Sequence, residues 1–193
     1  MPRRGGALRA AIGRGILRLI GWRLEAGLPD LAKFVVIVAP HSSNWDFIVG
    51  IGAALALRLD FNFVGKAELF RGPLGPLMRA LGGLPVDRHH PEGFVAQLVA
   101  LFAARKNLVL AMAPEGTRKP VQRWKSGFHR IAQGAGVPIV PAYLDNARRC
   151  VGFGPVFQPT GNAERDIAGL QEFYARFPRR DAGAREGDRP AGR

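Results

Sequence analysis

Residues His41 to Asp46, with the sequence HSSNWD, place an imidazole and a carboxylate five positions apart, directly after the apolar run FVVIVAP. On one continuous α-helix, five positions correspond to about 140° of rotation, so the two side chains could not share a face. They can meet if His41 lies in the loop after a strand and Asp46 lies in the first turn of the next helix. Asp46 would then hydrogen-bond one imidazole nitrogen and leave the other to accept a proton from a substrate hydroxyl.

The residues around this pair support the arrangement without requiring catalysis. Pro40 disfavours helical backbone at Ala39, and Ser43 or Asn44 suits the N-cap of the apolar helix that follows. An aspartate in the first turn is also favoured by the helix dipole. The segment could therefore be an ordinary helix start with His41 as a loop residue, and the spacing alone leaves both interpretations open.

Other segments bring charged and polar side chains to the ends of apolar runs. The segments FVGKAEL, GGLPVDR and APEGTRK contribute Lys66, Arg88, Glu115, Gly116, Thr117 and Arg118. Guanidinium groups bind phosphate with two parallel hydrogen bonds, and a glycine allows close approach of a ligand to the backbone. A single Arg or Lys after a strand is usually a solvated surface charge, but these three loops together with the His41–Asp46 loop form a more specific set.

The elements that must position these loops alternate along the chain. The expected strands are Phe34–Ala39, Phe61–Gly65, Leu84–Val86, Leu108–Ala113 and Pro138–Leu144. The expected helices are Trp45–Arg58, Leu74–Leu81, Pro91–Lys106, Ser126–Gly134 and Ile167–Phe177. Continuous apolar strands that alternate with helices predict a single α/β domain, with a central mostly parallel or mixed sheet flanked by helices. The functional loops are expected at the carboxyl ends of the strands.

The formal net charge of +13 calls for an anionic partner. Six arginines lie in the first 25 residues, and a helical projection places most of them opposite the apolar side chains Leu8, Ile12, Ile16, Leu17, Leu19, Ile20 and Leu24. This pattern is typical of a helix in an anionic membrane interface, although a helix docked on the protein core can share it. We predict a basic amphipathic membrane-interface helix in residues 1–30, the functional domain in 31–177 and a disordered basic tail in 178–193.

Further features of the sequence narrow the location of the protein. No stretch approaches the roughly 18 uninterrupted apolar residues of a membrane-spanning helix. The first residues lack the clean apolar centre of a signal peptide, because arginine interrupts them repeatedly. A single cysteine, Cys150, excludes an intramolecular disulfide and a multi-cysteine zinc site. We expect a peripheral protein at the cytoplasmic face of the inner membrane.

The ordered motifs resemble the glycerolipid acyltransferases, a family typified by 1-acylglycerol-3-phosphate O-acyltransferase. HSSNWD matches the family's His-x4-Asp block, GGLPVDR its glycine-led block ending in arginine, and PEGTR its Glu-Gly-Thr-Arg block. VPIVPA resembles a late proline-flanked block, and the lysine of FVGKAEL and the WKSGF segment also follow the expected order. The resemblance runs from Phe34 to Asp145. Pro40, Ala113 and Lys119 stand where the family often has asparagine, a bulky residue and serine.

The resemblance implies transfer of an acyl group from acyl-CoA or acyl carrier protein to a hydroxyl of a lyso-phospholipid. The default acceptor is 1-acylglycerol-3-phosphate, giving phosphatidic acid, and a lyso-ornithine lipid is an alternative. His41 would be the general base, oriented by Asp46. The acceptor's phosphate would be held by the cations Lys66, Arg88 and Arg118. The phosphate pocket would be shaped by Glu115, Gly116 and Thr117. Because the thioester is already activated, the reaction needs no cofactor, no metal and no Gly-x-Ser-x-Gly nucleophile.

Other classes of function fit the sequence less well. A metal hydrolase could use His41, Asp46, His89 and His90, but RHHP lacks the helical histidine spacing of zinc hydrolases. A nucleic-acid-binding module would explain the basic charge, but no recognised motif of that kind is present and the arginines favour the ends of the chain. A catalytically silent lipid-binding relative is a further alternative, but the presence of His41, Asp46, Glu115 and Arg118 argues against it. We therefore predict an O-acyltransferase without a nucleic-acid partner.

Overall fold

The computed structural model describes residues 1–25, 27–86, 91–117, 119–177 and 179 of the 193-residue chain. Its helices are α1 (Ala7–Leu19), α2 (Trp45–Ala56), the 3-10 helix η1 (Ala67–Phe70), α3 (Gly75–Ala80), α4 (Pro91–Ala104), α5 (Gly127–Ala135) and α6 (Ala163–Tyr174). Its strands are β1 (Arg23–Leu24), β2 (Lys33–Ala39), β3 (Asn62–Lys66), β4 (Gly83–Val86), β5 (Leu108–Met112), β6 (Ile139–Asp145) and β7 (Cys150–Phe153).

Within these residues the strands form one sheet with the order β1-β7-β6-β2-β5-β3-β4. Strand β2 pairs in parallel with β5 and β6, and β3 pairs in parallel with β5 and β4. Only the pairing of β6 with β7 is antiparallel among the described strands, since β1 again runs parallel to β7. The predicted α/β domain with a mostly parallel, mixed sheet is therefore confirmed.

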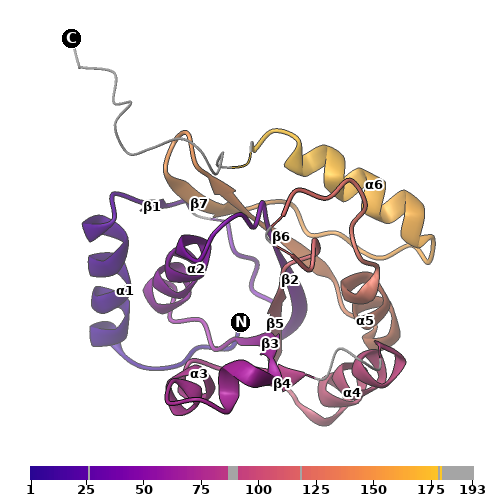
Figure 1. Ribbon diagram of the computed structural model, residues 1–193, viewed down its shortest axis with the longest axis horizontal. Coiled ribbons are helices and arrows are strands. Elements are labelled where there is room, and N and C mark those ends of the chain that lie inside the picture. Colours follow the sequence, from indigo (N-terminus) through magenta and orange to yellow (C-terminus); the bar gives the residue numbers. More distant parts are fainter. Residues whose placement is uncertain (26, 87–90, 118, 178, 180–193) are drawn as a thin grey trace.

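Helices cover both faces of the sheet (Figure 1). Alternate side chains of a strand point to opposite faces, and β2 shows the consequence. Val35, Ile37 and Ala39 enter a core shared with α4, α5 and α6, whereas Phe34 and Val36 pack on the side of α2. All these positions are apolar because the strand is buried on both faces, as the continuous apolar run predicted.

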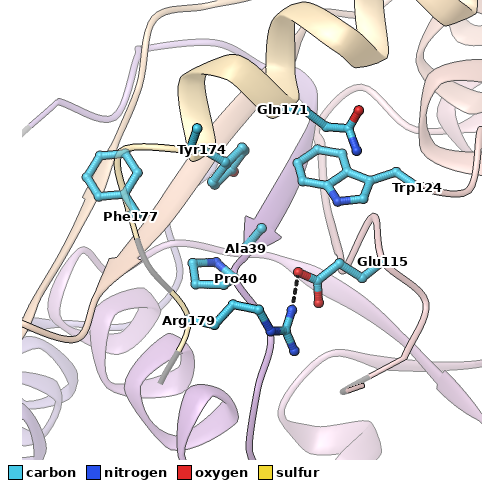
Figure 2. Close-up of a pocket in the computed structure, with 9 residues that line it drawn as sticks. Ala39, Pro40, Glu115, Trp124, Gln171, Tyr174, Phe177 and Arg179 are labelled. Carbon is cyan, nitrogen blue, oxygen red and sulfur yellow. Dashed lines mark hydrogen bonds and ion pairs between the residues drawn. The ribbon is translucent and has the colours of Figure 1, made fainter. Parts of the chain in front are cut away.

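Polar contacts attach α6 to its surroundings. On α5, the buried His129 places Nε2 2.7 Å from the carboxylate of Asp166 on α6. The hydroxyl of Tyr174 lies 2.6 Å from the carbonyl oxygen of Ile37 and 3.0 Å from that of Ala142, on the neighbouring strands β2 and β6. Figure 2 shows Tyr174 beside the end of β2, at Ala39 and Pro40. The last turn of α6 is therefore held where the central strands end.

Helix α1 packs mainly on α2 (Figure 1). Its buried residues are Ala10, Gly13 and Leu17. A Cβ atom added to Gly13 would lie 2.2 Å from the backbone nitrogen of Ala56, so this contact needs a residue without a side chain. Close approach of the two backbones at a glycine therefore fixes how α1 docks.

The N-terminal segment differs in detail from a single long amphipathic helix. Helix α1 ends at Leu19, and Arg23–Leu24 instead forms β1 at the edge of the sheet. The apolar residues of α1 divide between two faces, because Leu8, Ile12 and Leu19 are exposed while others are buried against α2. No helix in the described part of the chain is long and apolar enough to cross a bilayer.

We predict opposite effects of alanine at two glycines of α1. Gly13→Ala should lower the free energy of unfolding by about 1–3 kcal/mol, because the added methyl group pushes α1 from α2. Gly15→Ala is the matched control, since a Cβ there meets nothing within 4 Å. This change should raise the free energy of unfolding by about 0.5–1 kcal/mol through better helix propensity. Equal effects of both changes in denaturant titrations would contradict the docking contact.

Candidate active site

The carboxyl ends of four neighbouring parallel strands meet at one edge of the sheet. Strands β2, β5, β3 and β4 are adjacent in that order and run in the same direction. His41 follows β2, Glu115 follows β5, and Lys66 is the last residue of β3. The structure therefore places His41, Glu115 and the backbone of Lys66 at the same edge of the sheet. Arg88 and Arg118 lie outside the described residues, as does the side chain of Lys66.

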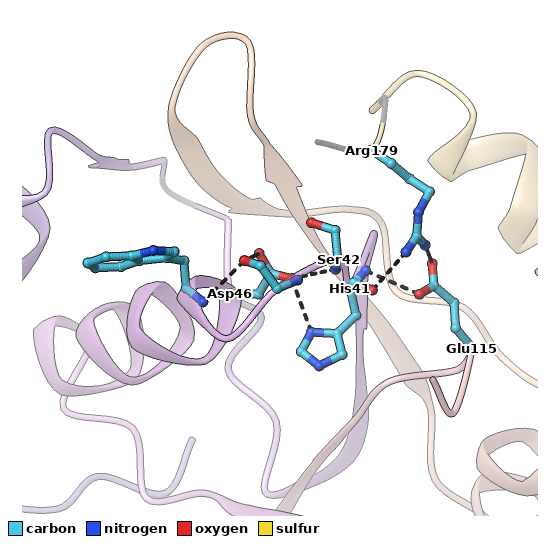
Figure 3. A network of polar contacts seen from close by, with 7 residues as sticks. His41, Ser42, Asp46, Glu115 and Arg179 are labelled. Atoms are coloured by element: carbon cyan, nitrogen blue, oxygen red, sulfur yellow. Dashed lines mark hydrogen bonds and ion pairs between the residues drawn. The ribbon is translucent and has the colours of Figure 1, made fainter. Parts of the chain in front are cut away.

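His41 and Asp46 meet in the geometry that their spacing predicted (Figure 3). Asp46 is the second residue of α2, and its Oδ2 lies 3.2 Å from Nδ1 of His41. The same oxygen accepts hydrogen bonds from the backbone N–H groups of Ser42 at 2.5 Å and Ser43 at 2.7 Å. The carboxylate is 5% exposed, whereas the imidazole is 25% exposed. Asp46 therefore shapes the start of the helix and orients the histidine with the same atom.

The environment keeps Asp46 ionised. Burial alone would raise the pKa of this carboxyl, but hydrogen bonds from His41 and from the N–H groups of Ser43 and Ser42 outweigh it, so the pKa lies below its usual range. An ionised Asp46 accepts a hydrogen bond from Nδ1–H of His41, and this favours the tautomer with an unprotonated Nε2. Figure 3 shows the other ring nitrogen pointing away from Asp46. His41 is thus arranged to accept a proton on its partly exposed side.

Glu115 lies beneath the histidine loop rather than on the surface. Its side chain is 5% exposed, and Oε2 accepts a hydrogen bond of 3.3 Å from the backbone N–H of His41. Its other oxygen, Oε1, lies 2.6 Å from Nη1 of Arg179 (Figure 3). The contacts of Glu115 in the structure are therefore with the backbone of the candidate base and with an arginine.

Gly116 and Thr117 form a tight turn after Glu115. Gly116 has φ of +66°, a backbone conformation that favours glycine. The hydroxyl of Thr117 accepts a hydrogen bond of 3.2 Å from the N–H of Lys119. A Cβ atom on Gly116 would lie 2.9 Å from Cδ of Lys125, so the stem of that lysine crosses the turn. Lys125 belongs to the WKSGF segment and adds a cation beside this turn that was not among the predicted site residues.

Arg179 is a contact residue that no local sequence pattern identifies. It lies 64 positions from Glu115 and 138 positions from His41, whose carbonyl oxygen accepts a hydrogen bond of 3.0 Å from its Nη2. No motif surrounds it, and it falls in the basic segment predicted to be a disordered tail. Of that segment, 178–193, the structure describes Arg179 alone, so the predicted disorder stays a prediction.

The single thiol of the chain is poorly suited to be a nucleophile. Cys150 is buried on β7, and burial together with a hydrogen bond to Glu25 raises its pKa to about 11. It is therefore protonated near neutral pH, where a thiolate would be needed for attack. Among the described residues, no three His, Cys, Asp or Glu side chains form a group that could hold a metal ion. His89 and His90 lie outside the described residues.

Comparison with known proteins identifies the family of this chain. A family model described as Acyltransferase matches residues 27–145. The chain belongs to the acyltransferase family. This match confirms the family that the ordered motifs predicted, and the matched residues contain both His41 and Glu115.

Curated relatives of this acyltransferase have specific names. The 1-acyl-sn-glycerol-3-phosphate acyltransferase of Escherichia coli strain K12 is 31% identical over 133 residues, which cover 64% of this chain and 53% of the relative. The protein of the same name from Streptococcus pneumoniae is 28% identical over 137 residues, covering 66% of this chain and 51% of the relative. The chain thus spans about half the length of these relatives.

A solved structure has the same fold as this acyltransferase. It is the crystal structure of the 1-acyl-sn-glycerophosphate (LPA) acyltransferase PlsC from Thermotoga maritima. The two share a TM-score of 0.58 over 89% of this chain and 80% of the other, with 18% sequence identity. The similarity therefore supports the arrangement of the sheet and helices.

We predict that Asp46→Asn lowers the free energy of unfolding by about 1–3 kcal/mol at neutral pH, since an amide replaces the charged acceptor. Because the folded-state pKa of Asp46 is depressed, its contribution is present above the unfolded pKa of about 3.9 and is lost as the pH falls through the folded value. The difference between the two proteins should therefore shrink toward acid pH in denaturant titrations. A difference that grows toward acid pH would contradict the depressed pKa.

Proposed function

We propose that this acyltransferase moves an acyl group from an acyl thioester to a hydroxyl of a lyso-phospholipid, with His41 as general base. The observation that carries the proposal is the contact of His41 with the buried carboxylate of Asp46 at the carboxyl end of β2. The names of the curated relatives support 1-acyl-sn-glycerol-3-phosphate as the first acceptor to test. Phosphatidic acid would be the product.

The reaction can be written without a covalent enzyme intermediate. Nε2 of His41 takes the proton of the acceptor hydroxyl as its oxygen attacks the thioester carbonyl carbon. The tetrahedral adduct then expels the thiol sulfur, which takes the proton back from the imidazolium. Asp46 stabilises the transient charge on the ring through Nδ1–H, and a base positioned in this way contributes about 10²–10⁴ in rate. The donor, acyl-CoA or acyl carrier protein, is a co-substrate, and no cofactor is required.

Cations after the strands would hold the acceptor's phosphate. We assign this role to Lys66, Arg88 and Arg118, with Gly116 and Thr117 shaping the turn beside them. The proposal is supported by the direction of β3, β4 and β5, whose carboxyl ends meet the end of β2 at one edge of the sheet. A lyso-ornithine lipid lacks this phosphate, so a panel of acceptors separates the two substrate classes.

The exposed face of α1 would attach the enzyme to a membrane surface. Leu8, Ile12 and Leu19 are 75%, 50% and 89% exposed, which leaves an apolar ridge on the side away from α2. Arg14 and Arg18 are exposed on the same helix and suit anionic lipid headgroups. The proposed partner is therefore an anionic bilayer, with peripheral attachment at the cytoplasmic face of the inner membrane.

Apolar residues at the start of α2 support the same orientation. Trp45 and Ile48 are 54% and 38% exposed, and they flank Asp46 in the first turns of the helix. Tryptophan is favoured where lipid headgroups meet the apolar bilayer interior. Contact of this region with a bilayer would bring the reacting edge of the sheet to the layer that contains lyso-phospholipids.

We expect His41→Gln to lower the rate of acyl transfer by about 10²–10⁴, because an amide cannot accept the hydroxyl proton. The assay uses purified full-length chain, labelled acyl thioester and lysophosphatidate. Arg123→Gln is a control, since that side chain is 90% exposed and its partner Glu164 is also exposed. An unfolding midpoint near that of the original protein excludes loss of structure. Turnover of His41→Gln close to that of the original protein would remove the base assignment.

The membrane proposal predicts that Leu8→Ser, Ile12→Ser and Leu19→Ser together weaken binding to anionic vesicles by about 10-fold or more, through loss of apolar contact. Val156→Ser is the control, as an exposed apolar residue outside α1. Binding of the original protein should also fall with added salt. Unchanged sedimentation of the triple variant with the vesicles would show that α1 is not the attachment surface.

A further inference from the structure

One ion pair holds both backbone polar groups of His41. Oε2 of Glu115 accepts the N–H of His41 at 3.3 Å, and Nη2 of Arg179 donates to the carbonyl oxygen of His41 at 3.0 Å. Glu115 and Arg179 are joined to each other at 2.6 Å. The three residues therefore form a closed arrangement around the peptide groups of the candidate base (Figure 3).

The burial of this pair makes it sensitive to the loss of either member. Glu115 is 5% exposed and Arg179 is 25% exposed. A buried carboxylate that loses its cationic partner is left with an uncompensated charge and tends to rearrange or to take up a proton. Without Arg179, the acceptor of the His41 N–H and the donor to its carbonyl would therefore both be disturbed.

The segment that carries Arg179 is anchored near the end of β2. Phe177 stacks on Tyr143, with ring centroids 4.2 Å apart and planes 5° from parallel. Tyr143 lies on β6 and is the register partner of Ala39, the last residue of β2. Figure 2 shows Phe177 and Arg179 near Pro40, with the guanidinium directed at Glu115. The chain after α6 thus returns to the strand that leads into His41.

A cavity of about 290 Å³ lies beside the ion pair. Glu115 and Arg179 line it together with Pro40, Trp124 and Tyr174 (Figure 2). This space allows methionine or lysine at position 179 without displacement of α6. The contribution of the guanidinium can therefore be tested by substitution, since its contacts with Glu115 and His41 are polar rather than close-packed.

We propose that Arg179 is a positioning residue, which fixes the backbone of His41 through Glu115 and through the His41 carbonyl group. The inference rests on the proposed role of His41 as general base. Asp46 orients the ring of His41, whereas the Glu115–Arg179 pair would fix where the ring is attached. Displacement of a reacting group by about 1 Å can cost about 10² in rate, so loss of Arg179 should act on the chemical step.

A direct role in binding the acceptor's phosphate is the main competing explanation for an arginine at this edge. The two explanations predict different kinetic effects. A phosphate ligand contributes to acceptor binding, so its loss raises the acceptor KM. A positioning residue leaves acceptor binding in place and lowers kcat.

The kinetic experiment compares Arg179→Met, Arg179→Lys and the control Arg176→Met in the full chain, with acyl thioester and lysophosphatidate. Arg176 is exposed and its Nε donates to the carbonyl oxygen of Phe173 within the same segment, so the control removes an equal charge away from Glu115. We expect Arg179→Met to lower kcat by about 10- to 100-fold with an acceptor KM within about twofold. Arg179→Lys keeps the charge but cannot contact Glu115 and His41 with two nitrogens, so its kcat should lie between those of Arg179→Met and the original protein.

Arg118→Ala serves as the reference for lost phosphate binding, with an expected rise in acceptor KM. A result for Arg179→Met that matches this reference, with raised KM and unchanged kcat, would overturn the positioning role. If Arg179→Met does not fold, the kinetics of Arg179→Lys decide in the same way. A Lys variant with unchanged kcat and KM would also overturn the proposal, since lysine cannot reproduce the contacts of a guanidinium fork.

A second readout does not depend on acyl transfer. Amide hydrogen exchange in the peptide that contains His41 should become about 10-fold faster in Arg179→Met than in Arg176→Met. In a double-mutant cycle, Glu115→Gln should add little to Arg179→Met, because both changes break the same pair. Unchanged exchange or additive effects on kcat would overturn the proposal. If the original protein transfers no acyl group but Arg179→Met still shows faster exchange, the proposed function would be rejected. The contact of Arg179 with Glu115 and His41 would still be supported.

Discussion

The arrangement of the site depends on a single carboxylate oxygen. Oδ2 of Asp46 receives the N–H groups of Ser42 and Ser43 and lies beside Nδ1 of His41. These groups belong to the loop after β2, while Asp46 belongs to α2, so the oxygen joins the end of a strand to the start of a helix. A plain helix start and histidine orientation were alternative interpretations of HSSNWD, and in the structure the same oxygen contacts the loop before α2 and the ring of His41. The interaction is strong because the charged carboxylate accepts several hydrogen bonds in a buried position.

The rest of the fold holds the two sides of this interaction in place. Strand β2 is the central partner of β5 and β6 and is buried on both faces, so the loop that follows it starts from a fixed position. Helix α2 is confined between the sheet and α1, where Gly13 permits close contact. Beneath the loop, Glu115 reaches the backbone of His41 from the segment that follows the neighbouring strand β5. The side chain and the backbone of the histidine are thus held from different elements.

Features that depend on neighbouring residues in the sequence could be predicted, whereas features that depend on distant residues could not. Strand β2 and helix α2 have long apolar runs, and the His41–Asp46 pair spans only five positions, so these features could be inferred. Strand β1, with two residues, is too short for a distinct pattern, and β7 was not among the expected strands. Helix α6 begins at Ala163, four residues before the expected Ile167, because its first turn is polar and is capped by the side chain of Asn162.

The contacts of Glu115 show where local patterns stop being informative. The turn that follows it was predictable, since Gly116 adopts a positive φ in a short Glu-Gly-Thr segment. The partner of its carboxylate was not, because Arg179 lies in a basic region that contains several similar arginines. Which of them meets a buried carboxylate depends on where α6 ends in space, and this follows from the packing of Tyr174 against β2 and β6.

The most direct test of the central claim is the protonation state of the two ring nitrogens of His41, measured by nitrogen-15 NMR on the labelled full chain at a pH where the ring is neutral. The account predicts the tautomer with the proton on Nδ1, donated to Asp46, and with Nε2 unprotonated; Asp46→Asn should weaken this preference. A neutral ring with its proton on Nε2 in the original protein would contradict the account, because that nitrogen could not accept a proton from a hydroxyl.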